Sequence, residues 1–124
     1  NPFVIEEKFS QSPFIDNIMV VGENQKFAAA IISPSFHFLK SWCKSHKVPY
    51  TSDAAVIENE RVKARINEEV KKYNQKLGET EKIKRITLVP EEWTVKNKLL
   101  TPTLKVKRPE IMNKYKEEIE KMFQ

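Results

Sequence analysis

The run Phe27-Ala-Ala-Ala-Ile-Ile-Ser33 decides the fold. Its side chains are apolar at successive positions, so both faces of a strand formed here would need to be covered. A second run rich in β-branched residues, 15–21, precedes it, and the turn formers Gly22-Glu-Asn-Gln25 lie between the two. The two runs therefore predict a β-hairpin whose second strand is central in a covered sheet.

Helix signals lie on both sides of this hairpin. Asn1 and Pro2 suit an N-cap and a first helical position, so a short helix is expected to open the chain and to end near Ser10. Ser35 can cap a second helix, which Pro49 is expected to stop. The second helix carries Phe36, Leu39 and Cys43 on one side, with Trp42 beside them.

A longer helix follows, because apolar residues recur at steps of four, four, three and four. These residues are Val62, Ile66, Val70, Tyr73 and Leu77. Gly78 is expected to end the helix as a left-handed cap. Residues 83–89 then have the composition of a third strand.

The C-terminal part is predicted as a loop and a helix. Residues 90–98 form the loop, with a small extra hairpin turning at Asn97, and Pro109 suits the first turn of a final helix. The inward face of that helix is expected to carry Ile111, Tyr115, Ile119 and Met122. The predicted fold class is α+β: one domain, residues 1–124, with a three-stranded sheet covered by helices.

Composition limits the class of protein. The 124 residues are 40% hydrophobic and 31% charged, as in ordinary folded domains. The longest apolar run is too short to cross a bilayer. Cys43 is the single cysteine, so no internal disulfide is possible, and a reducing, cytoplasmic location is expected. The chain starts with Asn-Pro and carries no leader pattern, so it reads as a piece of a longer protein.

The net charge of +5 is unevenly distributed. Elsewhere lysine and glutamate alternate, as on solvated helix faces, but one segment holds five cations and no acid. The five are Lys96, Lys98, Lys105, Lys107 and Arg108. Such a segment permits a nucleic acid, a phosphorylated cofactor or a membrane phosphate as partner.

Other polar and aromatic residues are expected to be structural. His37 and His46 lie nine positions apart on roughly opposite sides of a predicted helix, so they cannot share a metal ion, and no metal site is predicted. Glu91 and Glu92 are adjacent loop acids, which are normally solvated. Trp93 is expected to be a core or domain-interface residue.

The candidate site residues lie in one segment, Leu99-Leu-Thr-Pro-Thr-Leu-Lys-Val-Lys-Arg108. Pro102 fixes its own φ and makes Thr101 extended, and the hydroxyls of Thr101 and Thr103 can hold loop backbone groups. In an extended stretch Lys105 and Lys107 would point to one side of the chain. Leu104 and Val106 would then point to the other side. Arg108 lies at the start of the last helix, where its side chain is expected to form a structural bond with a carboxylate or a carbonyl.

This segment resembles the lysine loop of long-chain fatty-acid–CoA ligases in the acyl-adenylate-forming superfamily. The Thr-Pro-x-x-Lys-x-x-Arg pattern of that loop is matched by Thr101, Pro102, Lys105 and Arg108. The resemblance extends over essentially the whole chain, including Ser12-Pro-Phe-Ile-Asp16. Two positions depart from the wider superfamily: Leu104 precedes the lysine where glycine is usual, a form typical of long-chain members, and Lys98 follows Asn97 where many relatives have glycine.

The resemblance implies a mobile C-terminal lid of a two-step enzyme, an acid–thiol ligase. A large N-terminal domain, absent from these residues, would bind ATP, Mg²⁺ and the fatty acid. Lys105 would be catalytic, supported by Thr101, Pro102, Thr103 and Arg108, and coenzyme A would react after the lid rotates. The chain by itself would then be inactive.

Two other functions stay open from the residues. A nucleic-acid-binding module could use the basic segment with Trp93, although it would need aromatic residues on an exposed sheet face. A degenerate adenylation domain that only binds a partner is the other. Peripheral association of the parent enzyme with a membrane is also left open.

Overall fold

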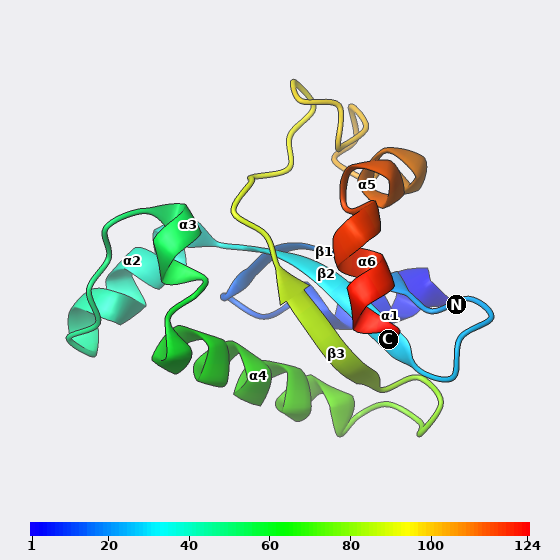
Figure 1. The fold of residues 1–124 in the computed structure, drawn as a ribbon, viewed down its shortest axis with the longest axis horizontal. Coiled ribbons are helices and arrows are strands. Elements are labelled where there is room, and N and C mark those ends of the chain that lie inside the picture. Colours follow the sequence, from blue (N-terminus) through cyan, green and yellow to red (C-terminus); the bar gives the residue numbers. More distant parts are fainter.

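The computed structural model describes all residues, 1–124, as a three-stranded sheet and six helices (Figure 1). The elements are α1 Pro2–Phe9, β1 Ile15–Val21, β2 Ala28–Pro34, α2 Phe36–Ser45, α3 Asp53–Val56, α4 Glu60–Asn74, β3 Ile83–Leu88, α5 Arg108–Lys114 and α6 Lys116–Met122. The predicted α+β class is confirmed. None of the helices has the length and apolar character needed to cross a membrane.

The sheet has the order β1-β2-β3, so β2 is central as predicted. β2 pairs antiparallel with β1 and parallel with β3. A parallel pair needs a long crossover, which the segment holding α2, α3 and α4 supplies. β1 is left with a free edge, and the candidate functional site lies beside this edge.

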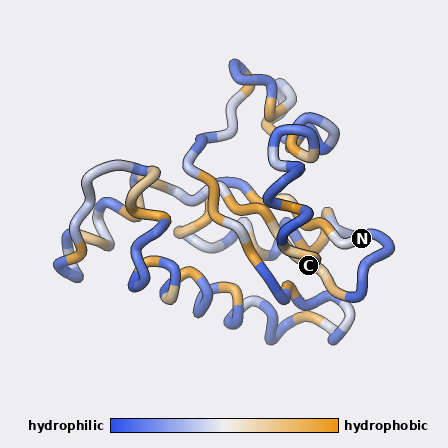
Figure 2. Tube along the Cα trace, in the orientation of Figure 1, coloured by the Kyte–Doolittle hydropathy of each residue, from blue (hydrophilic) through white to orange (hydrophobic).

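Two separate cores pack on the opposite faces of the sheet. Alternate residues of the strands point to each face, so Ile18 and Ile32 belong to one core while Met19 and Ile31 belong to the other. The first core also contains buried residues of α1, α2, α3 and α4. The second contains the segment from Val89 onward with α5 and α6. Figure 2 shows the resulting apolar strands at the centre of the molecule.

The predicted helix caps are present. The side chain of Asn1 accepts a hydrogen bond from the Phe3 amide at 3.0 Å, and Ser35 caps α2 through the Phe38 amide at 3.2 Å. α2 ends at Ser45, several residues before the proline expected to stop it. The short helix α3 was not predicted, because four residues carry no periodicity.

Two predictions about helix ends are wrong. α4 ends at Asn74, whose side chain bonds the backbone of Ile83 at the start of β3. Gly78 is not in the left-handed conformation, and Leu77 packs in the first core beyond the end of the helix. The final helix is broken at Tyr115, whose φ of −109° and ψ of 28° separate α5 from α6. The Tyr115 hydroxyl there donates to Oε1 of Glu91 at 2.8 Å.

Candidate functional site

The residues 99–107, named the lysine hairpin below, form a narrow turn that projects from the second face of the sheet. Leu100 and Val106 pair antiparallel across it. Nearer the tip, the Thr101 amide donates to the Lys105 carbonyl at 2.8 Å. The backbone of Lys105 is thereby fixed to the opposite arm of the hairpin.

The tip is a three-residue loop of Pro102, Thr103 and Leu104. The Leu104 amide donates to the Thr101 carbonyl at 2.8 Å, which closes the turn. The Thr101 hydroxyl accepts from the Lys105 amide at 3.1 Å and lies 3.1 Å from the Thr103 hydroxyl. The predicted role in holding loop backbone is confirmed for the Thr101 hydroxyl, whereas the Thr103 hydroxyl contacts the Thr101 hydroxyl. Pro102 takes the turn position where its fixed φ suits the chain.

The expected alternation of side chains along this segment is wrong. Leu104 has a φ of 66°, so the chain is not extended there. Three-residue hairpin loops place their last residue in this left-handed conformation, usually as glycine. Leu104 is consequently 66% exposed, whereas Val106, expected on the same side, packs against the second core.

The turn expected at Asn97 is present, but the antiparallel pairing lies farther along the chain. The Asn97 side chain accepts from the Thr94 amide at 3.0 Å and donates to the Glu92 carbonyl at 2.8 Å. Lys98 follows with a φ of 69°. This side-chain network forms a turn in place of the paired strands of a hairpin.

Arg108 anchors the lysine hairpin to the free edge of β1. Its guanidinium lies 2.5 Å from Oε2 of Glu6 and donates to the Val20 carbonyl at 3.2 Å. The same Glu6 oxygen accepts from the Val20 amide at 2.7 Å. Glu6 and Arg108 together satisfy both edge-facing backbone groups of Val20, as a neighbouring strand would. The predicted structural role of Arg108 is confirmed.

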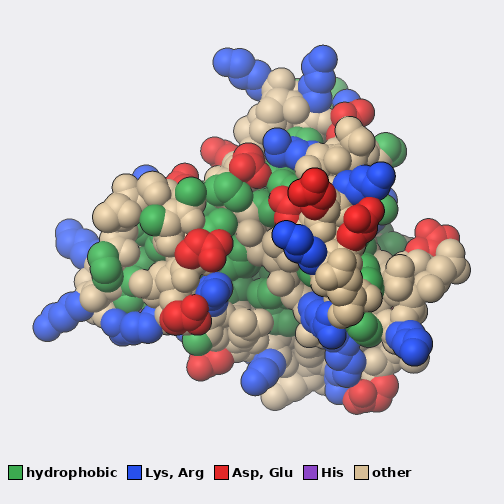
Figure 3. Space-filling model, viewed as in Figure 1, with side chains coloured by type: hydrophobic (Ala, Val, Ile, Leu, Met, Phe, Trp, Pro, Cys, Tyr) green, Lys and Arg blue, Asp and Glu red, His purple; other side chains and the backbone are tan.

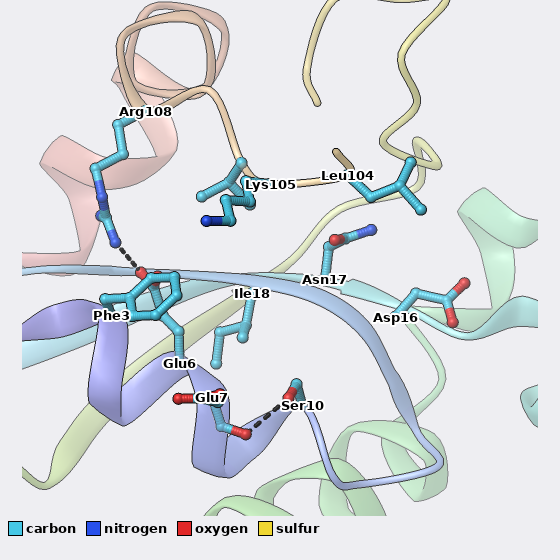
Figure 4. A pocket seen from close by; sticks show the side chains of 11 residues that line it. Phe3, Glu6, Glu7, Ser10, Asp16, Asn17, Ile18, Leu104, Lys105 and Arg108 are labelled. Atoms are coloured by element: carbon cyan, nitrogen blue, oxygen red, sulfur yellow. Dashed lines mark hydrogen bonds and ion pairs between the residues drawn. The ribbon is translucent and has the colours of Figure 1, made fainter. Parts of the chain in front are cut away.

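Lys105 lies over an open cleft of about 370 Å³ between α1, β1 and the lysine hairpin. Its ammonium is 5.8 Å from the centre of the Phe3 ring and forms no salt bridge. Figure 4 shows Lys105 above the Phe3 side of the cleft and Leu104 directed the other way. Asp16, also at the cleft, is exposed, yet desolvation and then the charge of Glu92 raise its pKa.

Most of the cationic segment is exposed. Figure 3 shows Lys and Arg side chains at the end of the lobe that the loop between β3 and α5 forms. Because Glu6 neutralises Arg108, the cations of this lobe are lysines, and Lys105 is the one that lines the cleft. The site therefore offers a single exposed ammonium, without a salt-bridge partner, on a backbone held by hydrogen bonds.

Trp93 and Glu91 belong to the second core. Trp93 is 2% exposed and donates through Nε1 to the Tyr115 hydroxyl at 3.1 Å. Burial, followed by the hydrogen bond to Glu91, raises the pKa of Tyr115 well above its usual value. Trp93 is confirmed as a core residue, but the expectation that Glu91 is solvated is wrong. Because both faces of the sheet are covered, the sheet itself offers no exposed aromatic platform for nucleic-acid bases.

The remaining candidates are structural as well. Cys43 is buried in the first core, and this burial raises the pKa of its thiol. His46 lies on the helix end with Nδ1 2.8 Å from the Trp42 carbonyl, and its ring stacks on the indole. Neither group is placed beside the cleft.

The whole chain, residues 1–124, matches the family model for the AMP-binding enzyme C-terminal domain. The chain belongs to this family of adenylate-forming enzymes. This AMP-binding C-terminal domain is 33% identical over 125 residues to long-chain-fatty-acid–CoA ligase 1 of Homo sapiens, covering 98% of the chain and 18% of that protein. It is 29% identical over 122 residues to the probable acyl-activating enzyme 16, chloroplastic, of Arabidopsis thaliana, covering 98% of the chain and 17% of that protein.

Solved structures support the fold. The AMP-binding C-terminal domain superposes with a TM-score of 0.75 on the A-PCP didomain of the carboxylic acid reductase from Segniliparus rugosus, at 20% identity, covering 98% of the chain and 16% of that protein. The adenylation domain of the carboxylate reductase from Mycobacterium chelonae gives 0.74, at 20% identity, with 96% and 17% covered. The chain spans less than a fifth of the length of these relatives.

Proposed function

We propose that this AMP-binding C-terminal domain is the catalytic lid of a long-chain fatty-acid–CoA ligase, in which Lys105 assists formation of the acyl-adenylate. The observation that carries the proposal is the state of Lys105: its backbone is fixed by Thr101, while its ammonium is exposed and unpaired. A lysine held in this way can be presented to a ligand outside its own domain.

The chemistry needs such a cation. A carboxylate oxygen of the fatty acid attacks the α-phosphorus of ATP, and pyrophosphate leaves. Both reactants are anions, so a positive charge beside the carboxylate and α-phosphate oxygens lowers their repulsion and stabilises the charge that develops. Lysine suits this role because it is a compact charge on a long stem.

The other substrates are assigned to a large domain of the longer protein. This chain has no group of three or more His, Cys, Asp or Glu side chains that could hold a metal, so we place Mg²⁺ with ATP and the fatty acid on that domain. After adenylation the lid reorients, the thiol of coenzyme A attacks the acyl carbonyl, and AMP leaves. The chain by itself is then inactive, because it supplies one of several required groups.

The similarity to long-chain fatty-acid–CoA ligases supports the substrate class. Several relatives with that name, or named long-chain acyl-CoA synthetases, are 29–33% identical to at least 96% of the chain. The experiment uses the full-length protein with Lys105→Ala and measures fatty-acid-dependent pyrophosphate release. We expect a fall of about 10²- to 10³-fold, by analogy with the loss of other charge-stabilising groups.

The matched control is Lys107→Ala, which removes a cation from the same hairpin. The rate of pyrophosphate release should change by no more than about twofold, because Lys107 is half-buried and lies outside the cleft. Thioester formation from chemically prepared acyl-adenylate should be unchanged in both variants. Wild-type pyrophosphate release by Lys105→Ala would overturn the proposal.

A further inference from the structure

Leu104 combines two unfavourable features. It is 66% exposed, the highest fraction among the large hydrophobic residues of the chain, and its φ is 66°. Left-handed backbone is strained for a residue with a Cβ and is ordinarily given to glycine. A buried core would justify a leucine here, but the side chain reaches neither core.

The fold itself does not require the leucine side chain. The turn is closed by the backbone of Leu104 and by the hydroxyl of Thr101, and both interactions would remain with glycine at position 104. In the isolated domain, therefore, the side chain adds strain and exposed apolar surface at the cleft without being buried in either core. Burial of this side chain against a surface outside the domain would remove its exposed apolar area from water.

We propose that Leu104 is the anchor by which the lysine hairpin docks on an apolar surface of the large domain during adenylation. This rests on the proposed function, since it requires Lys105 to enter a site on that domain. Leu104 and Lys105 are consecutive, and their side chains leave the tip in different directions (Figure 4). Leu104 can therefore be buried against protein while Lys105 extends to the anionic reactants.

The docked leucine acts on Lys105 in two ways. It fixes the position of the hairpin tip, which turns a flexible approach of the ammonium into a defined geometry. It also excludes water beside the ammonium, where the attraction to carboxylate and phosphate becomes stronger. Because the lid leaves this orientation before coenzyme A reacts, Leu104 is a positioning residue for the first half-reaction only.

The test uses the full-length protein with Leu104→Gly and Leu104→Met, and follows the two half-reactions separately. Glycine removes the side chain and relieves the backbone strain, so pyrophosphate release should fall by about tenfold or more, as expected from losing a buried leucine side chain. Methionine, an apolar side chain of similar volume, should retain the rate within about threefold. Thioester formation from prepared acyl-adenylate should stay at the wild-type rate in both.

Lys98→Gly is the matched control. Lys98 is another exposed residue with positive φ, at 69°, so its replacement loosens the neighbouring turn without removing an apolar anchor. It should release pyrophosphate within about twofold of wild type, as expected for an exposed position outside the site. An equal loss in Lys98→Gly and Leu104→Gly would overturn the docking role, as would wild-type adenylation by Leu104→Gly. If adenylation is impaired in Lys105→Ala but not in Leu104→Gly, only the docking role is refuted. If adenylation is unimpaired in Lys105→Ala, the proposed function is refuted.

Discussion

Replacement of Glu6 by alanine should destabilise the domain through the free edge of β1. The side chain is 8% exposed, and its Oε2 accepts from the Val20 amide at 2.7 Å and from Arg108 at 2.5 Å. Loss of the buried bond to a charged acceptor costs about 1.5–3 kcal/mol. The ion pair adds at most about 1 kcal/mol, because the Arg108 side chain is 38% exposed and water screens it. We expect a total loss of about 2–4 kcal/mol.

The assay is urea unfolding of the 124-residue chain, followed by tryptophan fluorescence. Glu7→Ala is the matched control, because Glu7 is exposed on the same helix and forms no salt bridge, so its effect should stay within about 0.5 kcal/mol. Glu6→Gln keeps an acceptor for Val20 and should lose about 1 kcal/mol. A loss below about 0.5 kcal/mol for Glu6→Ala would refute the reasoning that this carboxylate replaces a missing strand.

Two further stability predictions concern Tyr115 and Gly22. Because burial raises the pKa of Tyr115, the folded state holds the phenol proton more tightly than the unfolded state. The resulting contribution to the free energy of unfolding is complete below about pH 10 and declines above it by up to about 1.4 kcal/mol per pH unit. The free energy of unfolding in urea is measured between pH 9 and 11, a range of about two units around the usual tyrosine pKa. It should decline less steeply with pH in Tyr115→Phe than in the wild type, and parallel pH curves for the two proteins would contradict the assignment. Gly22 has a φ of 145°, and a Cβ there would lie 2.8 Å from the Phe27 carbonyl oxygen. Gly22→Ala should therefore cost about 2 kcal/mol or more in unfolding free energy, whereas Gly78→Ala, whose nearest contact would be at 3.6 Å, should be neutral or slightly stabilising.

Features that depend on neighbours in the sequence could be predicted. The caps at Asn1 and Ser35 follow from side chains that bond amides two or three residues away. The helical face of α4 follows from the spacing of its apolar residues, and the central position of β2 follows from apolar side chains on both its faces. The proposal that Lys105 is the site residue also rests on a local pattern, together with the family resemblance.

Features that depend on distant segments could not be predicted in the same way. The parallel pairing of β2 with β3 is set by a crossover of three helices, which strand composition does not reveal. Glu69 is 3% exposed and is held by Ser12 and Arg65. A signal for it existed, because Glu69 follows Ile66 by three positions on the apolar face of α4. Its partner Ser12, on a segment far away in sequence, was beyond any local pattern.

The strain at Leu104 could be inferred only once the loop geometry was known. The three-residue hairpin loop places position 104 in left-handed backbone, a conformation ordinarily given to glycine. From the sequence, the leucine is only a departure from the superfamily pattern; from the structure, it is an unfavourable conformation and an unfavourable exposure at one position. Under the proposed function, a lid that delivers a single ammonium would gain from having its hairpin fixed at both ends. The Glu6–Arg108 pair holds the base of the hairpin to the edge of β1. Leu104, docked on the large domain, would hold its tip, and Lys105 lies between the two points of attachment.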